Sequence, residues 1–256
     1  MRPILKFFQK TSVIAEFEII KIFRDPTEIF TRSVQPALWL LVFGQVFARM
    51  RITGNVNYLD FMAPGILAQS TLFVSIFYGI AIIWERDLGL THKFLATPTP
   101  RAALVLGKSL SAGVRCVPLA IIVYILAVLL GVHIVWEPLA LLGVLAMVIL
   151  GAIFFSTFSL IIACLVKTRE RFMGIGQLMT MPLFFASNAI YPIALMPGWL
   201  QALSRANPLT YMIDALREMM TGQVGQFGLG IDFLVLTISS LILVTIGASL
   251  YKQVIT

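Results

Sequence analysis

The chain is poor in charge and in cysteine. Only 12% of its 256 residues are charged, whereas a soluble domain carries about 25%. So little charge cannot coat a water-facing surface of this size, which excludes a soluble enzyme, a disordered regulator and a disulfide-stapled secreted module. The two cysteines, Cys116 and Cys164, have neither CxxC spacing nor a histidine partner. They therefore predict neither a zinc site nor a disulfide framework.

Apolar residues are abundant instead. They make up 59% of the chain, and the mean hydropathy is +0.94. A membrane-spanning helix needs roughly 20 mostly apolar residues, and uncharged stretches of about this size recur along the sequence. We expect an all-α integral membrane protein, a single transmembrane domain over residues 1–256, with six transmembrane helices. The predicted spans are about 32–50, 60–84, 114–135, 138–166, 172–194 and 232–252.

The basic residues predict the orientation. The chain has 19 Lys and Arg against 12 Asp and Glu, a net charge of +7. Basic residues of membrane proteins collect on the cytoplasmic side. With the N-terminus inside, every Lys and Arg falls on a cytoplasmic segment except Arg49, Arg51, Arg205 and Arg217. This asymmetry predicts a multi-pass protein of the cell (cytoplasmic) membrane with both termini cytoplasmic, and no nucleic acid partner.

The N-terminal stretch predicts a helix that lies in the membrane interface. Val13, Ile14, Phe17 and Ile20 follow a three-to-four-residue spacing, with charged residues between them. Pro26 ends this helix, because proline lacks a backbone donor and disfavours helix at the preceding residue. Such a helix either anchors the chain to the bilayer or also contacts a cytoplasmic partner.

The connection between the second and third spans is larger than a simple linker needs to be. It begins with the charged run Glu85-Arg86-Asp87, continues as a short helix containing Phe94 and Leu95, and reaches a proline-marked turn at 97–100. A charged, helical, inward-facing connection of this kind favours contact with a protein, although a solvated linker helix has the same composition.

The next residues resemble part of a phosphate-binding loop. Gly107-Lys108-Ser109 matches the end of G-x-x-x-x-G-K-[ST], but Ala102 stands where the first glycine belongs and the residues between are bulky and apolar. We expect no ATP binding here, and we expect Lys108 to extend its amine to the membrane interface.

The region from 172 to 220 is too long for one simple helix. Pro182, Pro192 and Pro197 divide it, and broken backbone at membrane depth must be buried in protein or face water. We expect a fifth span followed by a re-entrant helical hairpin at the outer leaflet. Asp214, Arg217 and Glu218 are placed to pair at the outer surface, with Arg217 three residues and Glu218 four residues after Asp214.

Several of these residues, taken in order, resemble a known family, the membrane permease subunit of ABC-2 type ATP-binding cassette exporters. The chain is most similar to the daunorubicin-resistance branch, and nodulation-factor and polysaccharide export permeases are close relatives. The matching segments are Arg24-Asp25-Pro26, Glu85-Arg86, Thr97-Pro98, Arg101, Gly107-Lys108, Ala189-Ile190-Tyr191-Pro192, Met196-Pro197, Asn207-Pro208-Leu209-Thr210-Tyr211 and Asp214-Ala215-Leu216-Arg217.

The resemblance implies partners and roles. A second permease protomer, identical or different, would pair with this chain, and ABC ATPase subunits would bind beneath and carry the ATP and Mg²⁺. The chain itself would bind no cofactor or metal and would not be an enzyme. In the family, a cytoplasmic coupling helix docks on the ATPase. Carried over here, the ATPase-coupling residues are Glu85, Arg86, Asp87, Lys93, Phe94, Leu95, Thr97, Arg24 and Asp25.

A substrate that passes between two protomers needs an apolar path with a few hydrogen-bonding groups. The same side chains also serve helix–helix packing, so both interpretations stay open. The candidate pathway residues are Gln69, Tyr78, Phe184, Phe185, Asn188 and Tyr191.

The predicted function is therefore a permease subunit of an ATP-driven exporter for a hydrophobic or amphipathic substrate such as a drug, lipid or glycolipid. One alternative is an ion-coupled carrier or channel, which usually places ionisable residues inside the bilayer. Another is an intramembrane lipid enzyme, but the topology puts His92 and His133 on opposite sides and no HExxH motif is present. The sequence leaves the substrate, the direction of transport and the choice of homodimer or heterodimer open.

Overall fold

The computed structural model describes residues 27–48, 57–88, 100–166 and 168–251. In these ranges the regular elements are helices, without a strand. Four of the helices are long and apolar enough to cross a membrane, which confirms an all-α integral membrane protein. They are α4 (Tyr58–Asp87), α6 (Arg101–Leu129), α7 (Pro138–Leu165) and α11 (Leu229–Leu250).

The remaining elements are shorter. A nearly continuous helical segment precedes α4, and its middle is a π-helical turn, η1. The others follow α7. The elements are α2 (Thr27–Leu38), η1 (Trp39–Gly44), α3 (Gln45–Ala48), α8 (Arg169–Phe185), the 3₁₀ turn η2 (Ile193–Leu195), α9 (Gly198–Ala206) and α10 (Pro208–Thr221).

Two of the predicted elements cannot be followed. The N-terminal interface helix and residues 89–97 of the predicted coupling helix, Glu85 to Thr97, lie outside the described residues. The α2–α3 segment and α8 occupy the positions of the first and fifth predicted spans, so the count of six spans remains a prediction. The region of the predicted re-entrant hairpin holds η2, α9 and α10.

Local sequence signals set the helix boundaries. The Asn57 side chain accepts a hydrogen bond from the Leu59 amide and caps α4. Asn207 caps α10 in the same way and is followed by Pro208, whose missing amide hydrogen suits a first helical position. Gly222 ends α10 in the left-handed conformation, at φ +68°.

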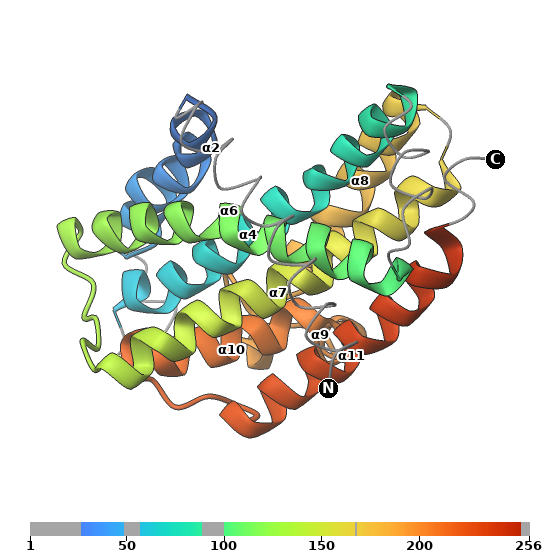
Figure 1. Cartoon of the computed structure of the whole chain (residues 1–256). Coiled ribbons are helices and arrows are strands. Elements are labelled where there is room, and N and C mark those ends of the chain that lie inside the picture. The colour runs from blue at the N-terminus through green and yellow to red at the C-terminus, as the bar shows by residue number, and fades with distance from the viewer. Residues whose placement is uncertain (1–26, 49–56, 89–99, 167, 252–256) are drawn as a thin grey trace.

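Helix α4 is the centre of the bundle. In Figure 1, α4, α6 and α7 run side by side through the middle, with α11 along one flank and α2 on the other side. In the most apolar 18-residue window of each helix, 78% of the residues of α4 are buried, compared with only 22% of those of α11. The main hydrophobic core takes most of its buried side chains from α4, α6, α7 and α10, so α4 packs against most of the bundle.

Candidate functional site

Charged and polar groups tie several helices together where α4 ends. Lys108 of α6 donates to the Glu85 carboxylate. Arg86 donates to the backbone oxygen of Val166, just past the end of α7, at 3.3 Å. Asp87 accepts two hydrogen bonds from Arg169 at the start of α8, at 2.8 and 3.1 Å. We call these residues, Glu85, Arg86, Asp87, Lys108 and Arg169, the charged junction.

Two aromatic rings complete the charged junction. The Arg169 guanidinium lies 4.4 Å from the ring centroid of the half-exposed Trp84. The Lys108 amine lies 5.9 Å from the ring of Tyr251, which is fully buried at the end of α11. Cation–π contacts of this kind add to the ion pairs. The charged junction thus connects α4, α6, the α7–α8 corner and α11.

Three of the predicted coupling residues, Glu85, Arg86 and Asp87, lie in the charged junction. The others fall outside the described residues. These are Lys93, Phe94, Leu95, Thr97, Arg24 and Asp25. The assignment of all nine to ATPase coupling stays a prediction.

Sequence reasoning missed Arg169 and misplaced Lys108. Lys108 does not extend to an interface. It is only 6% exposed and meets Glu85, because α6 already begins at Arg101 and packs this turn against the end of α4. The sequence contains both partners, an acidic residue at the end of α4 and a basic residue on α6, but only the tertiary fold brings the two side chains together.

The candidate pathway residues fall into two groups. Gln69 and Tyr78 are buried on α4, and the Arg115 guanidinium lies 5.2 Å from the Tyr78 ring. The other four lie at the end of α8 and in the non-helical segment that follows it. Phe184 and Asn188 are buried, Phe185 is 45% exposed, and the Tyr191 hydroxyl donates to the Phe185 carbonyl oxygen. Both amide atoms of the Asn188 side chain are buried and unpartnered.

A cavity of about 440 Å³ lies between α2, α4 and α6. Its lining combines polar and aromatic side chains, among them Arg32, Gln35, Ser70, Phe73 and Phe77. A lining that is partly polar and partly aromatic suits an amphipathic molecule. Sequence reasoning missed this cavity, because its wall is formed only when α2 packs against α4 and α6 in the tertiary fold.

The opposite end of α4, which we call the far end, contains a second polar arrangement. Non-helical backbone at 186–192 packs directly against α4: a Cβ on Gly65 would lie 2.6 Å from the Ala189 carbonyl oxygen and 2.8 Å from its Cα. Arg217 donates to the carbonyl oxygens of Asn188 at 2.7 Å and Phe61 at 3.3 Å, and the Tyr58 hydroxyl donates to that of Ile190 at 3.0 Å. The break in the helix is thus buried and hydrogen-bonded, as membrane depth requires.

The far end corrects one expectation. Arg217 does not lie at the surface beside Asp214 and Glu218. It is 6% exposed and its guanidinium points to main-chain oxygens, because α10 packs into the core and turns this face toward α4. Asp214 accepts the Phe227 amide hydrogen instead, at 2.9 Å.

His133 is also held at the far end. Its ring Nδ1 lies 3.0 Å from the Asp60 carboxylate, and its amide donates to the same side chain at 3.1 Å. Across the described ranges, no three His, Cys, Asp or Glu side chains gather into a metal-binding group.

The bundle of long apolar helices defines a polytopic membrane protein, and the ion pairs and hydrogen bonds of the charged junction join several of these helices at one end. A family model described as ABC-2 type transporter matches residues 9–221. The chain belongs to this family and is a permease subunit of an ABC exporter, which confirms the resemblance drawn from the motifs.

Named relatives span most of the chain. A protein named as a transport permease, ycf38 of Cyanophora paradoxa, is 31% identical over 82% of this chain and 74% of its own length. The daunorubicin resistance ABC transporter permease protein DrrB1 of Streptomyces coeruleorubidus is 26% identical over 80% of this chain and 73% of its own. Nodulation protein J of Rhizobium meliloti is 27% identical over 76% of this chain and 74% of its own length.

Proposed function

We propose that this permease is the passive membrane half of the exporter and that its energy enters at the charged junction. A separate ABC ATPase hydrolyses ATP with Mg²⁺, and no nucleotide binds to this chain. The permease works as a pair, with itself or with a sister chain, in the cytoplasmic membrane. The charged-junction end and both termini face the cytoplasm, which agrees with the basic residues of the sequence.

The observation that supports this proposal is the arrangement of ion pairs around the end of α4. The predicted coupling helix, Glu85 to Thr97, begins within the last turn of α4 and continues directly beyond it in the sequence. A displacement of that segment by an ATPase acts first on Glu85, Arg86 and Asp87. These side chains pass it to α6 through Lys108 and to α8 through Arg169. A set of side-chain contacts between rigid helices is the kind of network that carries coupling.

The substrate we propose is hydrophobic or amphipathic. The cavity between α2, α4 and α6 offers aromatic faces beside Arg32 and Gln35, and the spans hold few other ionisable groups. One relative is named for daunorubicin resistance and another for nodulation, which are different roles. This variety favours a drug-like, lipid or glycolipid cargo over an inorganic ion.

A charge exchange tests the proposed coupling. The chain is co-expressed with the ABC ATPase that co-purifies with it and reconstituted in vesicles, and ATP-dependent transport of fluorescent amphiphiles is measured. We expect Glu85→Lys and Lys108→Glu each to reduce transport about tenfold or more, because each places like charges in a nearly buried contact. The double variant restores the opposite charges and recovers most of the transport.

Arg171→Glu is the matched control. Arg171 is exposed in the same first turn of α8 as Arg169, and we expect its replacement to leave transport unchanged. Full transport in both single variants would contradict the coupling role. Uptake driven by an ion gradient in ATP-free vesicles would instead support a carrier and overturn the proposal.

A further inference from the structure

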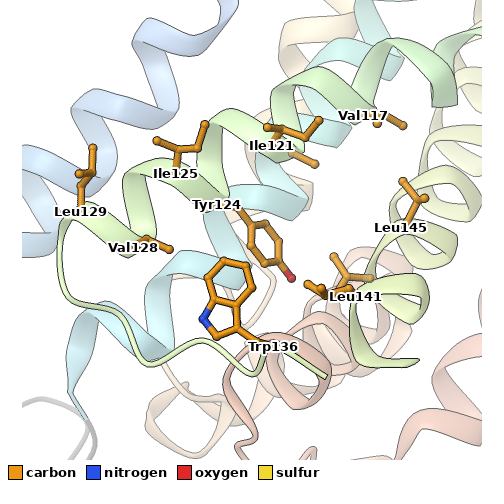
Figure 2. Close-up of a pocket in the computed structure, with 11 residues that line it drawn as sticks. Val117, Ile121, Tyr124, Ile125, Val128, Leu129, Trp136, Leu141 and Leu145 are labelled. Atoms are coloured by element: carbon orange, nitrogen blue, oxygen red, sulfur yellow. The ribbon is translucent and has the colours of Figure 1, made fainter. Parts of the chain in front are cut away.

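An apolar cavity of about 490 Å³ lies between α6 and the start of α7, apart from the cavity that α2 lines. It is a lateral groove whose rim is open: Ile121, Ile125 and Leu129 are each more than half exposed. Figure 2 shows the Tyr124 ring extending from α6 toward Leu141 of α7, with the Trp136 ring beside it. The lining residues are Val117, Ala120, Ile121, Tyr124, Ile125, Val128, Leu129, Trp136, Leu141, Val144 and Leu145.

The groove has the wrong chemistry for water. Its side chains are aliphatic or aromatic, and the Tyr124 hydroxyl is buried without a hydrogen-bond partner. An ordered water needs two to four polar partners, and one phenol cannot supply them. The groove therefore favours an apolar occupant over water, and its open rim faces the surroundings of the helix pair.

The dimensions point to one leaflet of a bilayer. From Val117 to Leu129 the α6 axis rises about 18 Å at ~1.5 Å per residue, and half of a ~30 Å hydrocarbon core is about 15 Å. Trp136, 64% exposed in the α6–α7 connection, marks the interfacial end, where tryptophan rings prefer to lie. The groove therefore begins at the membrane surface and ends near the midplane.

We propose that this groove holds one acyl chain of a membrane lipid from the leaflet at the Trp136 end. A single hydrocarbon chain enters through the open rim and contacts the Tyr124 and Trp136 rings. The proposal needs only that the chain spans a bilayer, and it holds whether or not the ATPase coupling is correct.

Photolabelling tests the occupant. The full-length protein is reconstituted in phosphatidylcholine vesicles that contain a phosphatidylcholine with a diazirine in one acyl chain, irradiated without any ATPase, and mapped by peptide mass spectrometry. We expect adducts to concentrate on Tyr124 and its neighbours in the groove. Leu234, which is 58% exposed on α11, is reached by lipid that merely surrounds the protein. The adduct yield at Leu234 therefore measures the background labelling.

Filling the groove sharpens the test. Ala120→Phe places a ring in the groove and is expected to lower the Tyr124 adduct about tenfold, since each displaced methylene weakens binding roughly fourfold. The adduct at Leu234 stays unchanged. Ile125→Trp, on the open rim, serves the same purpose if Ala120→Phe does not fold. Leu234→Phe is the control that leaves the Tyr124 adduct unchanged.

Two results would overturn the proposal. Labelling of Tyr124 at the Leu234 background, or labelling that neither filling variant reduces, would mean that no lipid chain occupies the groove. Photo-crosslinking of two copies through a diazirine amino acid at position 125 would mean that a second protomer covers it.

Discussion

The two ends of α4 hold their charged groups in different ways. At the charged junction, acidic and basic side chains meet one another, and the Asp87–Arg169 pair remains about 40% exposed on both sides. At the far end, the buried Arg217 donates instead to main-chain oxygens of Phe61 and Asn188. Side-chain pairs can part and re-form as helices move, whereas a main-chain carbonyl in a membrane cannot lose its only donor cheaply. The difference indicates a movable end and a fixed end.

The largest expected effect is at the fixed end. Arg217→Met leaves the buried Asn188 carbonyl oxygen without its donor and removes the second donor to the Phe61 oxygen, which keeps its partner within α4. We expect a loss of stability on the order of 3 kcal/mol, because an unsatisfied buried group costs about 1–3 kcal/mol. Thermal unfolding in detergent measures it, with a thiol-reactive fluorogenic dye that detects the buried Cys116 and Cys164. Arg205→Met, at an exposed position on α9, is the matched control. Equal unfolding curves for the two variants would contradict the fixed role of Arg217.

A smaller effect is expected from the close approach between α4 and the 186–192 segment. Gly65→Ala adds a Cβ that would lie under 3 Å from Ala189 backbone atoms, so backbone must shift. We expect destabilisation of about 1–3 kcal/mol, as for other overpacked cores. The same dye assay measures it.

Gly174→Ala on α8 is the control, because a Cβ there meets nothing within 4 Å and helix propensity favours alanine by about 1 kcal/mol. A stabilising Gly65→Ala would show that the two segments are not held this closely.

The smallest effect is expected at the movable end. A double-mutant cycle with Asp87→Ala and Arg169→Ala should give a coupling energy below about 1 kcal/mol, because exposed ion pairs gain little in water. The coupling should fall further at 1 M salt, where the screening length is only about 3 Å. Denaturation of the four proteins of the cycle measures it. A coupling of several kcal/mol that persists in salt would remove the distinction between the two ends.

The sequence predicted the class of fold and the charged run at the end of α4, because hydrophobic length and local charge are properties of consecutive residues. It did not predict the partners of Lys108 or Arg217. Lys108 meets Glu85, 23 residues away, and Arg217 meets Phe61, 156 residues away. Helical spacing on α10 favoured Asp214, three residues earlier, for Arg217, but packing of α10 against α4 turned the guanidinium toward main-chain oxygens. The tertiary fold therefore decides which hydrogen-bond partner each of these two side chains meets.

The hydrogen bonds of the 186–192 segment also constrain how the protein is made. Its carbonyl groups are satisfied from Tyr58, which is synthesised earlier, and from Arg217, which is synthesised later. When residue 192 leaves the ribosome, Arg217 has not yet emerged, and the Asn188 carbonyl must wait in water or at the lipid headgroups. The segment therefore reaches its final depth only after α10 has been translated, so this half of the bundle closes late in biogenesis.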